Sequence, residues 1–317
     1  MEKSNLKLTI MAIVSFLVCG TLPIVGYGLK GNNKPTEESK SWMKNVDGSK
    51  GLDEISMPGT HDSGATRSIA DVSGKCQDLP IKNQLEIGVR FFDMRLQQVN
   101  DEFAVCHEFI NEDLSFDDVL QDCYFFLKEN PSEALIMSIK EEAKSVSSSK
   151  TFTDGLKAKL DRYEEIMYFG NKIPTLDEIR GKIFFVSRFL PNTFGICAKH
   201  GWNGDCKNNS NTFDINNDAS LHVQDFYHFS DVSYKIEEVK KCLEYTSSYS
   251  YSGERTLSLN YFSGYLDDSF PPAYAVPVAK VMNAWAMDNL KDYSATGVAI
   301  FDFINKDLAK EVWSKNL

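Results

Sequence analysis

Polar side chains that can transfer protons or bind an anion recur at one kind of position, directly after short apolar runs of the sequence. These residues are His61, Asp62, Arg95, His107, Lys140, Arg188, Asp225 and Asp302. The chain has only five histidines, and two of them stand at such positions. Two imidazoles can divide the work of a general base and a general acid. An aspartate beside each one would fix its tautomer and favour the imidazolium.

The positive members of this set predict an anionic substrate. The guanidinium of Arg95 has a fork of donors that suits a phosphate, and Lys140 and Arg188 add charge. No serine or cysteine stands in a recognisable nucleophile motif. These residues therefore predict attack on a phosphodiester by the substrate's own hydroxyl, which gives a cyclic phosphate.

The elements that must position these residues are predicted to alternate between strands and helices. The candidate strands are 54–57, 89–95, 103–106, 134–139, 182–187, 221–224, 256–260 and 297–301. The candidate helices are 81–87, 116–130, 153–162, 176–180, 232–246, 276–289 and 305–315. Strands that alternate with helices indicate a parallel sheet.

Eight strands, most of them joined by helical crossovers, favour a closed barrel over an open sheet. We therefore expect the α/β class, with an irregular (β/α)8 TIM barrel as a single domain. It is irregular because helices are weak or missing after the second strand and around the sixth and seventh. The carboxyl ends of barrel strands form one face, where catalysis takes place. The polar residues are expected to converge there.

Composition excludes several classes of protein. The 317 residues are 42% hydrophobic, which is enough for a sizeable core and excludes disorder. Lysine and arginine number 34 against 45 acidic residues, for a net charge of −11. A field of that sign repels nucleic acid, and no basic patch offsets it, so we expect no nucleic-acid partner.

The N-terminus predicts export. Lys3 and Lys7 precede the apolar run 8–25, which is typical of a secretory signal within residues 1–30. The run is long, so an uncleaved anchor that tethers the protein outside the membrane is the alternative. Residues 31–50 are polar and predict a linker before the domain at 51–317. An exported chain permits disulfides, and Cys197 with Cys206 is the expected pair.

Two motifs resemble a known family. The segments Ile-Ser-Met-Pro-Gly-Thr-His-Asp-Ser, at 55–63, and Gly-Val-Arg-Phe-Phe-Asp-Met-Arg, at 88–95, resemble the opening motifs of the X-domain of phosphatidylinositol-specific phospholipase C. The resemblance is strongest to the small secreted bacterial enzymes, which cleave phosphatidylinositol and often glycosylphosphatidylinositol (GPI) anchors. Weaker matches in the right order extend it over most of 51–317.

The resemblance implies a role for each site residue. His61 would be the general base on the inositol 2-hydroxyl, oriented by Asp302, and His107 the general acid, paired with Asp62. Arg95 would bind the phosphate. The inositol ring would be held by Lys140, Arg188, Asp225 and Tyr227. The loop around Trp202 is unlike the family's, so this tryptophan is left out of the expected site.

The resemblance also bears on cofactors and partners. Calcium-dependent relatives place acidic ligands where the metal-free bacterial type has the arginine that matches Arg95, so we expect no metal and no other cofactor. The expected partners are a phosphatidylinositol or GPI lipid and, transiently, a membrane surface. Two roles stay open for the aromatic residues beside the seventh strand, namely ordinary loop packing and contact with the membrane by insertion or by choline binding. These residues are Tyr245, Tyr249, Tyr251, Tyr261, Phe262, Tyr265 and Phe270. We expect a monomer.

Two alternatives stay open. One is a metal-dependent barrel phosphodiesterase of the glycerophosphodiester or sphingomyelinase type, which a chelator would inactivate. The other is a non-catalytic X-domain that only binds inositol lipid. Loss of a catalytic histidine would mark such a module, whereas His61 and His107 are both present.

Overall fold

The computed structural model describes residues 33–67, 74–107, 110–202, 211–216, 219–268 and 274–317. Its centre is a twelve-stranded sheet in which eight neighbouring strands are parallel. In sheet order these are β6 (Met167–Tyr168), β7 (Ile183–Arg188), β5 (Leu135–Glu141), β2 (Phe91–Val99), β1 (Met57–Thr60), β14 (Val298–Phe301), β12 (Arg255–Tyr261) and β10 (Ala219–Gln224). The sheet curls into an irregular barrel, and within the described residues no ladder joins its two ends.

The remaining strands extend this sheet or stand beside it. An antiparallel strand, β9 (Asn211–Asn216), borders β10, and β8 (Ile196–Cys197) pairs with β7. A hairpin of β3 (Glu102–His107) and β4 (Ile110–Ser115) branches from β2. A separate pair consists of β11 (His228–Phe229) and β13 (Tyr265–Leu266).

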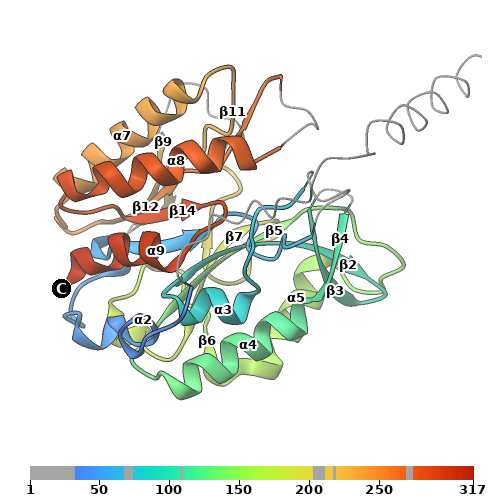
Figure 1. Ribbon diagram of the computed structural model, residues 1–317. Helices are drawn as coiled ribbons and strands as arrows, with labels where there is room; N and C mark the ends of the chain where they lie inside the picture. The colour runs from blue at the N-terminus through green and yellow to red at the C-terminus, as the bar shows by residue number, and fades with distance from the viewer. Residues whose placement is uncertain (1–32, 68–73, 108–109, 203–210, 217–218, 269–273) are drawn as a thin grey trace, which may run out of the picture.

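Helices surround the curled sheet. In Figure 1, α7 and α8 lie along its upper side, and α3, α4 and α5 lie below it. The helices are α2 (Glu37–Lys40), α3 (Ile81–Glu86), α4 (Phe116–Glu129), α5 (Phe152–Leu160), α6 (Leu176–Ile179), α7 (Val232–Ser248), α8 (Val276–Asn289) and α9 (Lys306–Trp313). Short 3-10 turns occupy Trp42–Asn45, Leu52–Glu54, Asp161–Ile166, Leu290–Asp292 and Ser314–Asn316. Because both faces of the sheet are covered, strands such as β5 are buried nearly throughout.

Register places three basic side chains in one row. Arg95 is opposite Lys140, and Lys140 is opposite Arg188, on the neighbouring strands β2, β5 and β7. Residues in register on parallel strands point to the same face of a sheet. Three residues far apart in the sequence therefore face the same space, with Lys140 and Arg188 at the carboxyl ends of their strands and Arg95 midway along β2.

The expected irregular barrel is confirmed as a curled sheet, but the expected closure is not seen within the described residues, and two strands differ locally from the prediction. The first strand begins at Met57, three residues after the predicted start at Glu54, because Leu52–Glu54 form a 3-10 turn. Pro58 and Gly59 lie inside β1, and because strands usually avoid both residue types, the sequence pattern did not indicate a strand over Met57–Thr60.

The second difference concerns residues 103–106, predicted as a barrel strand. They belong to β3, which is antiparallel to β2, so His107 reaches the site on a hairpin. The turn at Asn100 and Asp101 has positive φ at both residues, as a two-residue hairpin requires.

Residues 31–50 were predicted to be a linker. Their described part includes α2 and a 3-10 turn, and Trp42 and Met43 are buried in the core. The predicted signal at 1–30 lies outside the described residues. Within the described part of the chain, no helix is both long enough and apolar enough to cross a bilayer.

Candidate active site

A cavity of about 350 Å³ opens at the carboxyl ends of the strands. Eight of the nine predicted site residues line it: His61, Arg95, His107, Lys140, Arg188, Asp225, Tyr227 and Asp302. The ninth, Asp62, is fully buried and bonds to His107 from behind. The structure thus brings together the whole predicted set.

His61 follows β1 and is held in one tautomer by its neighbours. Its backbone N–H donates to the carbonyl of Phe301, 3.0 Å away. Nδ1 lies 2.8 Å from Oδ1 of Asp302, and Nε2 lies 2.7 Å from Nη2 of Arg95. A guanidinium only donates and a carboxylate only accepts, so Nδ1 carries the hydrogen and Nε2 accepts. The ring is therefore neutral and can take up a proton.

His107 forms the second histidine–aspartate pair. Its Nδ1 donates to Oδ2 of Asp62, a residue whose φ is +41°. Burial lowers the pKa of His107, but the hydrogen bond and charge of Asp62 outweigh it, so the pKa lies above its usual value. A raised pKa keeps this ring protonated, as a general acid requires.

Arg95 lies between the two pairs and contacts three buried carboxylates. Its guanidinium nitrogens lie 3.6 Å from Asp62, 3.4 Å from Asp93 and 3.6 Å from Glu142. Burial lowers the pKa of Arg95, but the charges of these carboxylates raise it well above the usual value. The guanidinium is therefore a fixed positive charge at the cavity floor.

Asp93 supports two of the basic side chains. It is fully buried and ion-pairs with Arg95 at 3.4 Å and with Arg188 at 3.2 Å. Burial alone would raise the pKa of Asp93, but the charges of the two arginines lower it to about 2. Asp93 therefore supports both guanidinium groups from beneath the cavity.

The far side of the cavity combines charge with aromatic surface. The guanidinium of Arg188 stacks 3.9 Å over the ring of Trp202. The indole Nε1 of Trp202 donates to Oδ2 of Asp225 at 3.0 Å. The rings of Tyr227 and Tyr265 lie 6.0 Å apart beside them. Such a wall offers donors, acceptors and ring faces to a polyhydroxylated ring.

Sequence reasoning left out several residues that line the cavity, and three of them contact or adjoin the predicted set. Trp202 is one, since its loop gave no match. Glu142 is another, with Oε2 2.5 Å from Nζ of Lys140. The two residues are two positions apart, and that spacing in a strand was a usable signal for a shared face. Burial raises the pKa of Cys76, the third, well above the usual value, so it is a neutral thiol and not an activated nucleophile.

The aromatic docking prediction needs correction at three residues. Tyr261 and Phe262 are each 1% exposed and pack in the core. The hydroxyl of Tyr249 donates to Asp53, which ion-pairs with Arg255 at the start of β12, the edge opposite the cavity. Of the predicted aromatic residues that the structure describes, only Tyr265 lines the cavity. Phe270 lies outside the described residues.

The cysteine prediction concerns Cys197, whose thiol is free in the structure. Its expected partner, Cys206, lies outside the described residues. The pairing therefore stays a prediction.

Comparison with known proteins decides the family. The family model for phosphatidylinositol-specific phospholipase C, X domain, matches residues 56–189. A protein named 1-phosphatidylinositol phosphodiesterase from Staphylococcus aureus strain Newman is 32% identical, over 66% of this chain and 70% of that protein. The chain belongs to the phosphatidylinositol-specific phospholipase C X-domain family.

The likeness extends over the full length. A 1-phosphatidylinositol phosphodiesterase from Listeria monocytogenes is 27% identical, over 100% of this chain and 99% of that protein. A solved structure of the Staphylococcus aureus phosphatidylinositol-specific phospholipase C superposes with a TM-score of 0.78 at 26% identity, covering 88% of this chain and 98% of that one. The family recognised from the motifs is confirmed, and the fold of the phospholipase C barrel with it.

Proposed function

We propose that this chain cleaves the phosphodiester of phosphatidylinositol and releases diacylglycerol and inositol 1,2-cyclic phosphate. The observation that carries the proposal is the pair of histidine–aspartate units on either side of Arg95 in one cavity. An enzyme that catalyses this reaction is a phosphorus–oxygen lyase of the phospholipase C type. The names of two relatives, one of them matched over nearly its full length, agree with this substrate.

His61 acts as the general base in this proposal. In the free site its Nε2 accepts from Arg95. When substrate binds, the guanidinium of Arg95 donates to the phosphate instead of to His61, and the inositol 2-hydroxyl donates to Nε2 of His61. The hydroxyl proton passes to Nε2 and the oxygen attacks phosphorus, while Asp302 at 2.8 Å stabilises the imidazolium that forms.

His107 acts as the general acid. Breaking the bond between phosphorus and the glycerol oxygen leaves an alkoxide that needs a proton. The raised pKa of His107 and its bond to Asp62 keep that proton available on the ring. The proton goes to the glycerol oxygen, so diacylglycerol leaves neutral and the phosphate remains as a cyclic diester.

Arg95 stabilises the phosphorane-like charge, and no metal enters the proposed reaction. The guanidinium already fills the space among Asp62, Asp93 and Glu142, where a calcium ion would otherwise find oxygen ligands. Lys140, Arg188, Asp225 and Tyr227 are proposed to hold the inositol ring. A GPI anchor has the same inositol diester, so the proposal includes it.

The proposal also places the enzyme outside the cell, at a membrane surface. The charged start and apolar run of residues 1–30 support export or an N-terminal tether. One similar structure concerns modulation of membrane binding by the Staphylococcus aureus enzyme. Tyr265, at the cavity, is the proposed docking residue of this chain, which we expect to act as a monomer.

Phosphorus NMR tests the reaction. Purified residues 31–317 are mixed with phosphatidylinositol micelles in excess EDTA, and a cyclic phosphodiester signal is expected. His61→Ala should lower the rate by about 10²–10⁴-fold, whereas His200→Ala, which changes an exposed histidine, should not. Near-normal turnover in His61→Ala would contradict the assigned base. Activity that EDTA abolishes and calcium restores would contradict metal independence.

A further inference from the structure

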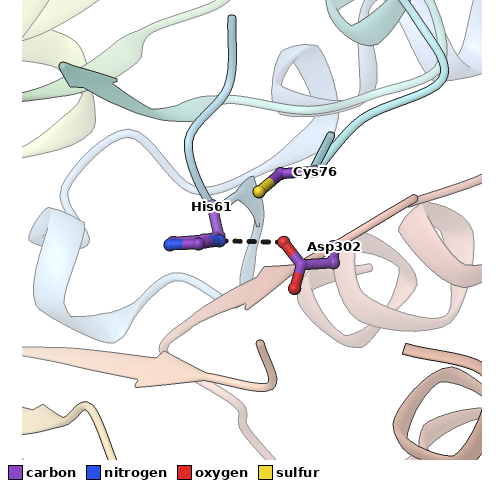
Figure 2. Close-up of side chains that lie close together, drawn as sticks. All are labelled: His61, Cys76 and Asp302. Atoms are coloured by element: carbon purple, nitrogen blue, oxygen red, sulfur yellow. Dashed lines mark hydrogen bonds and ion pairs between the residues drawn. The ribbon is translucent and has the colours of Figure 1, made fainter. Parts of the chain in front are cut away.

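Cys76 has no task in the proposed reaction, yet its thiol lies beside the base. One ligand atom each from His61, Cys76 and Asp302 all lie within 4.8 Å of one another. Figure 2 shows the sulfur of Cys76 pointing toward the hydrogen bond between His61 and Asp302. All three residues line the cavity, so an ion entering from solvent can reach them.

Asp302 is a buried carboxylate that makes no ion pair with a lysine or arginine among the described residues, although its charge acts on the buried ammonium of Lys235. It is 1% exposed, and within the described residues its only ion-pair partner is His61, which the hydrogen-bond pattern makes neutral. Its second oxygen, Oδ2, has no hydrogen-bond partner among those residues. By contrast, Asp62, Asp93 and Glu142 each contact the guanidinium of Arg95. A buried charge in this state attracts a cation.

The backbone positions of His61, Cys76 and Asp302 are linked by hydrogen bonds from a backbone N–H and from the side-chain amide of Gln77. The N–H of Phe303, next to Asp302, donates to the carbonyl of Cys76 at 2.8 Å. The side-chain amide of Gln77 donates to the carbonyls of His61 and Phe301 at 2.8 and 2.9 Å. Ligands held in this way lose little entropy when an ion binds.

We propose that His61, Cys76 and Asp302 form a binding site for one thiophilic divalent cation, Zn²⁺ or Cd²⁺, and that its occupancy inhibits the enzyme. The inhibitory part of this inference rests on the function proposed above. Thiolate, imidazole and carboxylate are the ligands that zinc takes, with bonds of about 2.0–2.3 Å, so small side-chain movements close the site.

Binding exchanges protons for the metal. The thiol of Cys76 loses its proton to solvent. The ion takes the place of the hydrogen on Nδ1 of His61, and the neutral ring keeps its one hydrogen on Nε2, so the donor of Arg95 must turn away from that nitrogen. Asp302 then binds the ion and no longer stabilises an imidazolium, and the ring has no nitrogen left that can accept the proton of the inositol 2-hydroxyl. The general base is thereby disabled without any change in the fold.

A second cluster, Asp62, Cys76 and His107, uses the same sulfur. One chain therefore holds one ion through Cys76. The cluster with His61 is favoured because Arg95 contacts the carboxylate of Asp62 directly, and its positive charge opposes a cation there. On His61, Arg95 contacts Nε2, which is the ring nitrogen that faces away from Asp302.

Equilibrium dialysis with Cd²⁺ or Zn²⁺ alone, together with turnover of phosphatidylinositol, tests the site. Wild type, Cys76→Ala and Cys106→Ala are compared, each relative to its own metal-free rate. Cys106 is a matched control, since it is a buried thiol that also feels the charge of Asp62 but lies outside both clusters. Circular dichroism verifies the fold of each variant, and Cys76→Ser replaces Cys76→Ala if the latter does not fold.

Wild type and Cys106→Ala should bind one ion per chain and lose turnover reversibly, with EDTA restoring the rate. Cys76→Ala should bind at least about ten- to a hundredfold more weakly. Ca²⁺ should have no effect, because a thiol site does not select it. Equal binding or equal inhibition in Cys76→Ala would overturn the proposal. Binding through Cys76 in a chain with no turnover would instead retain the site and reject the proposed function.

Discussion

Arg95 performs two tasks through one planar group. It balances Asp62, Asp93 and Glu142 and donates to Nε2 of the base. A guanidinium can meet several partners in different directions because it carries five N–H donors. A lysine ammonium, as a compact point charge, does not reach so many partners from one position.

Arg95→Lys is therefore expected to lower kcat by about 10²–10³-fold, which corresponds to about 2.7–4 kcal/mol of transition-state stabilisation. The reason is loss of the planar fork with the charge retained. Steady-state kinetics on phosphatidylinositol measures it, with Arg162→Lys at an exposed position as the control. A kcat within threefold of wild type would show that charge alone suffices.

His222 makes the free energy of unfolding depend on pH in the acidic range. It lies in β10, with its ring stacked 3.7 Å from Tyr245 and Nδ1 2.7 Å from the hydroxyl of Thr212. Burial lowers the pKa of His222 from 6.5 to about 4. Between these values the unfolded chain binds a proton that the folded chain does not. The contribution to stability is complete above pH 6.5 and is lost as pH falls toward 4.

His222→Gln should remove that acid sensitivity. Relative to its difference from wild type at pH 7.5, the variant should gain about 2 kcal/mol in free energy of unfolding at pH 5. Urea denaturation at both pH values measures this, with His228→Gln, a partly exposed histidine, as the control. An unchanged difference between the two pH values would mean that His222 titrates normally in the fold.

At the level of elements, Gln77 joins two strand ends. It is 1% exposed, and its amide donates to carbonyls of His61, after β1, and Phe301, in β14. These two strand ends carry the base and the aspartate that orients it. Gln77 is thus a positioning residue, because its effect on the reaction passes through the distance between His61 and Asp302.

Gln77→Leu should lower kcat by about ten- to a hundredfold with little change in KM. Leucine keeps the bulk but leaves two buried carbonyls without a donor, and displacement of a reacting group by 1 Å can cost about 10²-fold. Gln97→Leu, on the more exposed part of β2, is the control. A rise in KM with kcat unchanged would indicate a role in substrate binding instead.

The elements also show what sequence patterns can reveal. Arg95, Lys140 and Arg188 were identifiable because a charged residue at the end of an apolar run has few other reasons to be there. The hairpin of β3 and β4 was missed as such, because an apolar run does not say whether its partner is parallel. Trp202 was missed because a loop residue is placed by tertiary contacts, here with Arg188 and Asp225.

At the scale of the whole molecule, the segment 36–46, which holds α2 and the first 3-10 turn, covers the end of the barrel opposite the cavity. Trp42 is 1% exposed, stacks 6.3 Å from Trp313 near the C-terminus and donates to the carbonyl of Gly88 at 3.0 Å. Arg90 is fully buried, ion-pairs with Glu133 at 2.9 Å and donates to the carbonyl of Lys40. Both ends of the described chain are therefore fastened to the same region.

Trp42→Ala should lower the free energy of unfolding by about 3–5 kcal/mol, through lost burial and the cavity left behind. Urea denaturation of residues 31–317 gives the value. Tyr234→Ala, at a side chain that is 59% exposed, should change it by no more than about 0.5 kcal/mol. A loss below 1 kcal/mol in Trp42→Ala would mean that the segment is not part of the cooperative unit.

The row formed by Arg95, Lys140 and Arg188 limits where the coding sequence can gain or lose codons. The three side chains reach one cavity because their strands keep a common register. Deletion of a single codon within β5 would shift that register by one and turn Lys140 to the outer face of the sheet. Insertions and deletions compatible with the reaction are therefore confined to the connecting loops, while the strands that carry the row must keep their length.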